Sequence, residues 1–542
     1  MISFLHGDAE CALTDPLPNS RFRDKFPERN AFRYESMVIF MKTTRMTTLL
    51  LAALMAAGTV TFASCGGDGT ASPTQTEAPG TDTAAEEVTT AEPDPFEGFD
   101  FGGEEIRILV SANDYDGRGS SIYAIKHEEE ENGDIVKDNV YKRNKNVEEL
   151  LNVQFVFTEN EEDYTVIPKT INKYVTAGDD AYDLVIHDLF PLCTLSVQNA
   201  FLNTYDLPYL DFSKDYWYDA YMKDVSFASD DKRYILAGDY FLDILRSAHA
   251  LYVNKEMFNS IFESAEELYD HVLNGTWTHE TFLGYINEAY QDINGDGKAD
   301  DDDRYGYCTI NYWGPMIPWV IASDITFLEY ESDGAPRFAM NNERSVQLLL
   351  NLNDIFHGEG THNYSAGIDI NTAAFVNGNA LFGGYQRVSS LEMFRDMETD
   401  IGILPYPKMD ESQENYITSS HDTANVGVIP MTCSKGDTMG AVLEVLSRES
   451  AKDVIPAYYE TALKVKYARD EMSAQMLDII RYNISCVFPV AFGNYCYDMP
   501  LQKAFSTPLN SKKTDFVSNY VKYEEKAQAK LDELWEAFNA ME

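Results

Sequence analysis

Glu105-Ile-Arg-Ile-Leu-Val110 indicates the fold class, because it opens an ordered series of apolar segments. This run lies between Gly102-Gly103 and Ser111-Ala-Asn-Asp114, and it predicts a buried strand. Residues 135–150 then carry apolar side chains at helical spacing, and Val153-Gln-Phe-Val-Phe157 predicts a second strand. A strand, a helix and a second strand are therefore expected in succession.

The next segments continue this alternation of strands and helices. A helix is expected over 166–177, and Tyr182-Asp-Leu-Val-Ile186 predicts a third strand. This order predicts a parallel sheet with crossover helices, and so an α/β fold. Ligands of such sheets lie beyond the carboxyl ends of the strands. We therefore expect Asn113-Asp114-Tyr115 and His187-Asp188 at the mouth of a site.

Further strands and helices are predicted along the rest of the chain, without an internal repeat. A chain of 542 residues is too long for one core, so two or three domains are expected. Strands are expected at 234–241, 250–254, 380–383 and 425–430, and helices near 255–258, 278–290, 343–356, 371–377, 439–450 and 516–541.

The chain is strongly acidic, with 89 Asp and Glu against 42 Lys and Arg and a net charge of −47. This charge repels nucleic acid and anionic lipid headgroups, so neither is an expected partner. The 30 Phe and 34 Tyr nevertheless supply ample material for a core.

Residues 41–64 have the composition of an export signal. Lys42 and Arg45 precede an apolar run from Leu49 to Phe62, and small residues lead from there to Cys65. The run has 14 residues, whereas a membrane-spanning helix needs roughly 20. We therefore predict a signal peptide rather than a membrane span.

Cys65 and the residues around it resemble the lipobox of bacterial lipoproteins, although Phe62 replaces the usual aliphatic residue. Lipid attachment at Cys65 would hold the chain at the extracellular face of the cell membrane. An ordinary signal peptide with a chance cysteine is the alternative. Residues 65–98 are expected to be the lipidated cysteine and a flexible linker, because few of them are apolar. Residues 1–40 are polar and precede a better signal start, so we interpret them as a start-site artefact.

Five further cysteines show no metal-binding spacing: Cys193, Cys308, Cys433, Cys486 and Cys496. Their odd number disfavours a complete disulfide framework. A Cys486–Cys496 bridge stays open, and buried reduced thiols are the favoured interpretation.

The segment from Asp292 to Asp303 has the spacing of a calcium-binding loop. Calcium takes about six to eight oxygen ligands, and the sharp turn at position six of such a loop favours glycine. Asp303 stands where glutamate is usual, so a lower affinity is expected. A structural Ca²⁺ is predicted, and a solvated acidic turn is the alternative. The predicted ligands are Asp292, Asn294, Asp296, the Lys298 carbonyl, Asp300 and Asp303, with Gly297 at position six.

Five local stretches together resemble the sugar-type extracellular solute-binding proteins of ABC importers, the family that includes maltose-binding protein. These stretches are Asp138–Val153, Gly178–Val185, Ala250–Phe258, Ala373–Phe382 and Ile401–Pro407. Their order and spacing carry the resemblance. It implies two α/β lobes joined by hinge crossings, with a ligand held in the cleft between them. By this resemblance one lobe contains 99–242 and 368–422, and the other contains 243–367 and 423–542.

The resemblance also implies which residues face the cleft. Aromatic rings pack on the C–H faces of sugars, and polar side chains satisfy the hydroxyls. Trp313 and Tyr385 are the foremost candidates, and His421-Asp422 is a weaker one. The implied ligand-binding residues are Asp114, Asp188, Tyr240, Asp243, Trp313, Tyr385 and Arg387.

The function implied is a lipid-anchored, monomeric receptor that captures an oligosaccharide and delivers it to an ABC-transporter permease. A surface-anchored glycoside hydrolase is the alternative, because acidic pairs are abundant. A surface adhesin is a third possibility, although the chain shows no repeated β modules. No nucleophile-elbow, metalloprotease or nucleotide-binding motif is present in the sequence, so an enzyme is not expected.

Overall fold

The computed structural model describes residues 94–112, 124–126, 133–162, 166–298, 300, 302–364, 369–394, 397–463 and 471–541. The chain divides into two units, Met1–Thr90 and Ala91–Glu542, and every element below belongs to the second. The predicted signal peptide, Cys65 and Asp114 lie outside the described residues. Within the described ranges, no helix has the length and apolar character needed to cross a membrane.

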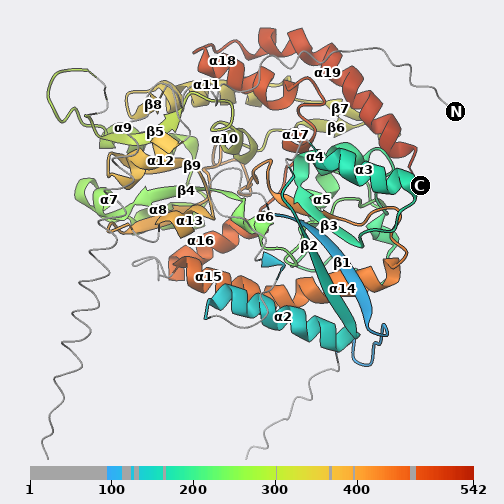
Figure 1. Ribbon diagram of the computed structural model, residues 1–542. Helices are drawn as coiled ribbons and strands as arrows, with labels where there is room; N and C mark the ends of the chain where they lie inside the picture. The colour runs from blue at the N-terminus through green and yellow to red at the C-terminus, as the bar shows by residue number, and fades with distance from the viewer. Residues whose placement is uncertain are drawn as a thin grey trace, which may run out of the picture. The chain divides into compact units, whose positions relative to one another are not determined.

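The first sheet contains the strands that the opening sequence predicts. It comprises β1 (Glu104–Ser111), β2 (Val153–Asn160), β3 (Leu184–Asp188) and β11 (Asn425–Val428), in the order β11-β3-β1-β2. β2 and β3 both run parallel to β1, and β11 runs antiparallel to β3. The predicted parallel sheet with crossover helices is therefore confirmed (Figure 1).

The crossover helices begin and end as local sequence dictates. The Asp134 side chain accepts hydrogen bonds from the backbone N–H groups of Val136 and Lys137 at the start of α2 (Ile135–Leu151). Asn152 ends α2 in the left-handed conformation, and Gly178 ends α3 (Ile167–Ala177) in the same way. α2 therefore leads directly into β2, whereas residues 178–183 connect α3 to β3.

The second sheet is mixed. It comprises β4 (His249–Asn254), β5 (Tyr305–Ile310), β8 (Thr361–Tyr364), β9 (Ala380–Arg387) and β10 (Ile401–Leu404), in the order β10-β4-β9-β5-β8. Helices packed on it include α7 (Lys255–Ile261), α9 (His279–Ala289), α11 (Glu343–His357), α12 (Asp369–Val376), α13 (Ser390–Phe394) and α16 (Glu471–Tyr482). Other helices here are α8 (Glu266–Leu273) and α10 (Ile317–Ala322), and a small hairpin pairs β6 (Leu328–Tyr330) with β7 (Pro336–Phe338).

Helices that follow β11 pack on elements that flank both sheets. α14 (Gly436–Glu449) and α15 (Ile455–Leu463) pack against α2, whereas α19 (Phe516–Asn539) packs against β7 and α11 (Figure 1). Between them lie η3 (Ser450–Val454), α17 (Phe488–Ala491), η4 (Met499–Ser506) and α18 (Thr507–Asn510).

Strand pairing corrects the lobe boundaries that the resemblance implied. Residues 368–422 were assigned to the first lobe, but β9 and β10 both pair with β4 in the second sheet. Residues 423–542 were assigned to the second lobe, but β11 pairs with β3 in the first. An apolar run indicates that a strand is buried, whereas its partner depends on register and topology. We therefore define the first lobe by the sheet β11-β3-β1-β2 and the second by the sheet β10-β4-β9-β5-β8.

The strand predicted at 234–241 does not form. This segment makes only isolated bridges, from Leu236 to Gly427 and from Gly238 to Trp217. A Cβ at Gly238 would lie 2.5 Å from the Trp217 ring, so the segment is held by close side-chain packing. A short apolar run does not by itself distinguish a sheet strand from a buried connection.

Two of the segments that cross between the lobes run side by side. The first contains α6 (Asp243–Arg246) and leads into β4, and the second connects β10 to β11. Ala248 forms a bridge with Ser420, and the His421 N–H donates to the Ser247 carbonyl at 3.0 Å. The crossings are thus hydrogen-bonded to each other where the chain passes between the sheets.

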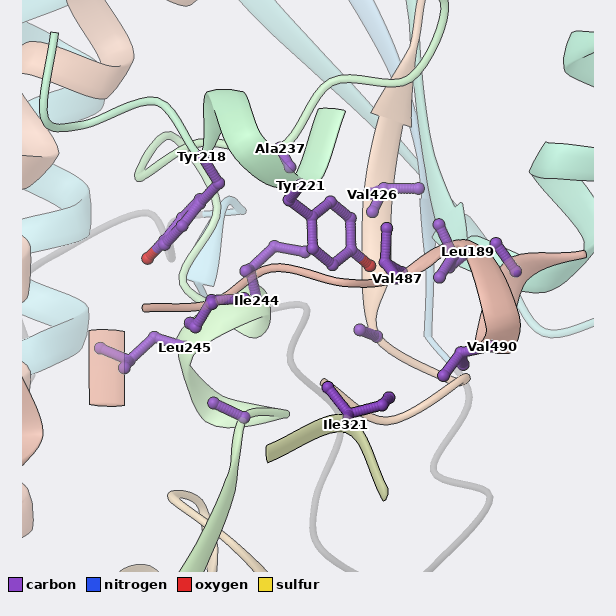
Figure 2. Close-up of a cluster of buried hydrophobic side chains, with 14 of the residues drawn as sticks. Leu189, Tyr218, Tyr221, Ala237, Ile244, Leu245, Ile321, Val426, Val487 and Val490 are labelled. Carbon is purple, nitrogen blue, oxygen red and sulfur yellow. The ribbon is translucent and has the colours of Figure 1, made fainter. Parts of the chain in front are cut away.

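A buried apolar cluster surrounds the crossings. Ile244 of α6, Val426 of β11 and Ile321 of α10 all belong to this cluster (Figure 2). Leu189 opens α4 (Leu189–Ser196), and Tyr221 lies on α5 (Asp219–Asp224). Side chains associated with both sheets therefore share one core around the hinge.

Candidate ligand-binding cleft

A cavity of about 480 Å³ lies beside the second crossing. Its lining includes Asp188 at the carboxyl end of β3, Tyr385 and Arg387 at the end of β9, and residues 421–423 of the crossing. It therefore takes residues from both lobes and from the hinge between them. Ligand pockets typically measure 300–1,000 Å³, so this cavity has the size for a small solute.

A bulge in β9 aims Tyr385 into the cavity. The pairing of β4 with β9 shifts by one residue between Ala250 and Tyr252, and Tyr385 adopts φ 54°. Positive φ is unfavourable for a tyrosine, and such strain is found where a side chain must be redirected. The Tyr385 N–H donates to the Tyr406 hydroxyl at 3.0 Å, which secures the bulge.

The Tyr385 ring is clamped by its neighbours. A Cβ added at Gly314 would lie 2.2 Å from the Tyr385 hydroxyl oxygen, so the ring is seated against this glycine. The His249 ring stacks on it at 5.8 Å between centroids, and the His421 Nε2 lies 3.3 Å from its hydroxyl. Tyr385 is only 9% exposed, so its position is fixed before a ligand arrives.

The turn at the second crossing supplies polar groups to the cavity. The His421 Nδ1 lies 2.7 Å from the Asp422 carboxylate and 2.9 Å from the Thr423 hydroxyl. Burial raises the pKa of Asp422, but His421, Arg387 and the Thr423 N–H together lower it below its ordinary value. Asp422 is therefore an anion at neutral pH.

Two aromatic residues of the lining come from the loop after β5. Tyr312 and Trp313 pack together with centroids 5.7 Å apart, and both line the cavity. Tyr312 is 43% exposed, so its ring is open to solvent. Flat rings beside carboxylates and an arginine can pack on the faces of a sugar while satisfying its hydroxyls.

Four of the seven predicted ligand-binding residues line this cavity: Asp188, Trp313, Tyr385 and Arg387. The structure also brings His421 and Asp422 there. Whether each contacts a ligand stays a prediction.

Tyr240 and Asp243 require a correction, because neither belongs to the lining. The Tyr240 hydroxyl donates to the Leu236 carbonyl at 2.8 Å within the core. The Asp243 carboxylate accepts from the backbone and side-chain amides of Asn425 at 2.8 and 2.9 Å. Both residues lie in or beside the first crossing, where proximity in sequence to a predicted cleft does not reveal side-chain direction.

Sequence reasoning missed the contribution of the C-terminal segment. Asn494, Asp498 and Gln502 line the cavity, as do Phe190 of α4 and Met393 of α13. Tyr497 and Asp498 both have positive φ, which turns the chain sharply into η4. Two consecutive non-glycine residues in this conformation carry no recognisable sequence signal.

The predicted calcium loop folds around its own backbone amides. The Asp292 carboxylate accepts from the N–H groups of Gly295 and Gly297, at 2.7 and 2.9 Å, and Gly297 has φ 73° as expected for position six. Asp303 accepts from the Ile293 N–H at 3.1 Å. Within the described part of the chain, no three His, Cys, Asp or Glu side chains are grouped to hold a metal ion. Calcium binding stays a prediction.

The five cysteines of the described body are free thiols. Cys486 is half-buried and the other four are buried, so the open alternative of a Cys486–Cys496 bridge is not formed in this structure.

No family model and no curated protein sequence matches this chain. The solved structure of uncharacterized protein lmo0859 from Listeria monocytogenes EGD-e is similar, with a TM-score of 0.52 and 11% identity over 79% of this chain and 99% of the other. The chain therefore shares the α/β fold of that structure, with its two sheets in two lobes.

Two further structures have lower TM-scores. A cyclo/maltodextrin-binding protein complexed with maltotetraose gives 0.49 and 12% identity over 81% of this chain and 97% of the other. The maltose-binding protein MalE from Listeria monocytogenes, in complex with maltose, gives 0.48 and 13% identity over 79% and 97%.

Proposed function

We propose that this chain is the extracellular solute-binding receptor of an ABC importer, and that its solute is an oligosaccharide. One observation carries the proposal: a cavity lined from both lobes lies at the paired crossings that join them. A ligand held by both lobes stabilises the arrangement in which they close on it. Binding and release, rather than catalysis, are the expected activity.

The lining supports a sugar as the solute. Trp313 and the prepositioned Tyr385 offer apolar faces, while Asp188, Asp422 and Arg387 offer hydrogen-bonding groups. Rings that are fixed before binding lose little conformational freedom when the ligand arrives.

The remaining parts of the proposal rest on the sequence. The lipobox-like Cys65 supports a lipid anchor at the extracellular membrane face, and the family resemblance supports delivery to a permease. The spacing of 292–303 supports a structural Ca²⁺ in the second lobe, beside β5.

A thermal-shift screen of the whole purified chain tests the proposal. Mono- and oligosaccharides, amino acids and peptides are added separately, and each sugar is recovered by chromatography after several hours. A ligand at 100 times its Kd stabilises the folded state by about 2.7 kcal/mol, which raises the Tm. We expect a shift with oligosaccharides, recovered intact. Consumption of the sugar would favour the hydrolase, and shifts with peptides or amino acids alone would remove the carbohydrate part.

A further inference from the structure

The charged side chains that line the cavity are mostly acidic. Asp188, Asp422 and Asp498 contribute carboxylates, whereas Arg387 is the one Lys or Arg side chain among the lining residues of the described chain. His421 adds a positive charge only when protonated. At neutral pH the lining therefore has more negative than positive groups.

The positive charge of Arg387 is already opposed. Its field helps to hold the pKa of Asp422 below the ordinary value. The reciprocal effect is that the Asp422 anion offsets the guanidinium charge that an incoming anion would meet. An acidic ligand entering this cavity therefore finds no uncompensated cation among the lining residues described here.

The other two carboxylates lie in different surroundings. Asp188 is 3% exposed and stands at the N-terminus of the eight-residue helix α4, where the helix dipole favours an anion. Burial raises the pKa of Asp498, and Lys503 opposes that effect. The pKa of Asp422 is lowered and that of Asp498 is raised, so Asp422 holds its negative charge more firmly than Asp498.

The net charge of the whole chain is negative, like that of the cavity lining. A chain with a net charge of −47 lowers the local concentration of anions around it. Carboxylates accept hydrogen bonds from hydroxyls and ammonium groups, but they repel a second carboxylate and cannot hydrogen-bond to it.

We propose that the cavity selects oligosaccharides that are neutral or bear amino groups, and excludes those that bear uronate, sialate or phosphate groups, with Asp188 and Asp422 as the discriminating residues. This inference rests on the proposed function and adds the chemical class of its ligand. Hydroxyl and ammonium donors pair with the two carboxylates, whereas an acid would bring like charges together in a partly buried site.

Matched trisaccharides test this selection on the whole chain. Cellotriose and maltotriose are each compared with the corresponding C6-oxidised triuronate, and the glucosamine trimer is included as a cationic probe. In at least one of these series, calorimetry should show that the neutral trimer or the glucosamine trimer binds tenfold or more tightly than the triuronate. Added salt should reduce this ratio, because screening weakens repulsion between charges.

Two substitutions separate charge selection from general loss of binding. Asp422→Asn keeps the shape of the side chain and removes its charge, so the preference over the triuronate should fall at least fivefold. Asp215→Asn makes the same change at an exposed position outside the lining, and the preference should stay as in the wild type.

The outcomes distinguish the two proposals. Triuronate binding equal to or tighter than that of the neutral trimers overturns the charge selection and leaves the oligosaccharide receptor standing. An unchanged preference in Asp422→Asn also counts against the inference. If no trimer of any charge binds, the oligosaccharide proposal itself fails and the inference fails with it.

Discussion

Among single residues, the aromatic rings of the cavity matter most for the proposed binding of an oligosaccharide. Trp313→Ala should weaken oligosaccharide binding by about 1–3 kcal/mol, because a buried aromatic contact is lost. Calorimetry with the ligand found in the screen measures the change. Trp535→Ala is the matched control: Trp535 packs against Phe227 and Phe538, away from the cavity lining, so its loss should lower the Tm without changing affinity. Equal affinities of wild type and Trp313→Ala would refute the role of this ring.

Gly314 gives a second prediction at this scale. A Cβ there would lie 2.2 Å from the Tyr385 hydroxyl, so Gly314→Ala should displace the ring and weaken binding by about 1–2 kcal/mol. Gly284→Ala on α9 is the control, since an added Cβ there meets nothing within 4 Å and should leave affinity unchanged. Wild-type affinity in Gly314→Ala would show that the Tyr385 position is unimportant.

At the scale of elements, the start of α17 responds to pH. The Asp224 carboxylate accepts hydrogen bonds from the backbone N–H groups of Val487 and Phe488, yet burial raises its pKa to about 6. A carboxyl that holds its proton more tightly when folded stabilises the fold at low pH. That contribution is lost as the pH rises from about 4 to about 6.

Asp224→Asn should therefore flatten part of the pH dependence of stability. The variant keeps an oxygen acceptor for the two amides and has no charge to bury, so at pH 7.5 it should match or exceed wild-type stability. From pH 4.5 to pH 7.5, the free energy of unfolding of the variant should gain roughly 1–3 kcal/mol over that of the wild type. Urea unfolding between pH 4.5 and 7.5 measures it, with Asp215→Asn as the surface control. A variant that follows the wild-type profile at every pH would contradict this assignment.

The loop before β5 carries the calcium prediction. Calorimetry of the whole chain should show Ca²⁺ binding, with a Kd of roughly 10⁻⁴–10⁻³ M as in extracellular modules, because aspartate replaces the longer glutamate at position twelve. Asp292→Asn should weaken binding by at least tenfold, and Asp215→Asn should not. Absence of binding heat, together with a Tm that is insensitive to a chelator, would favour the solvated acidic turn.

Most of the fold's elements could be predicted because their signals are local. The βαβαβ opening follows from apolar runs separated by a helical pattern, and α2 begins at a capping aspartate that the sequence shows directly. The pairing of β9, β10 and β11 could not be predicted, since an apolar pattern does not specify which strand lies next to it in the sheet. The strand predicted at 234–241 was wrong, because side-chain packing around Gly238 buries this segment without extended pairing to another strand.

The site was predictable only in part for the same reason. Asp188 and Arg387 follow from the rule that ligands lie at strand ends and from the resemblance, and both line the cavity. The side-chain directions of Tyr240 and Asp243 depend on hydrogen bonds to Leu236 and Asn425. The part of the lining from Asn494 to Gln502 depends on long-range packing of the C-terminal segment, which no local pattern encodes.

At the scale of the whole molecule, two sheets share a core around a pair of hydrogen-bonded crossings. The cavity is lined by the turn of one crossing, so a ligand that contacts His421 and Asp422 also contacts the hinge. Contacts that exist only when the lobes meet around a ligand favour the closed arrangement by their own free energy.

The most direct test of the central claim is small-angle X-ray scattering of the whole chain with and without the oligosaccharide identified by thermal shift. We expect a smaller radius of gyration at saturating ligand, because both lobes contribute to the lining of one cavity. Trp313→Ala should show little or no such change at the same ligand concentration. Saturated binding that leaves the radius of gyration of the wild type unchanged would contradict a receptor whose two lobes close on their solute.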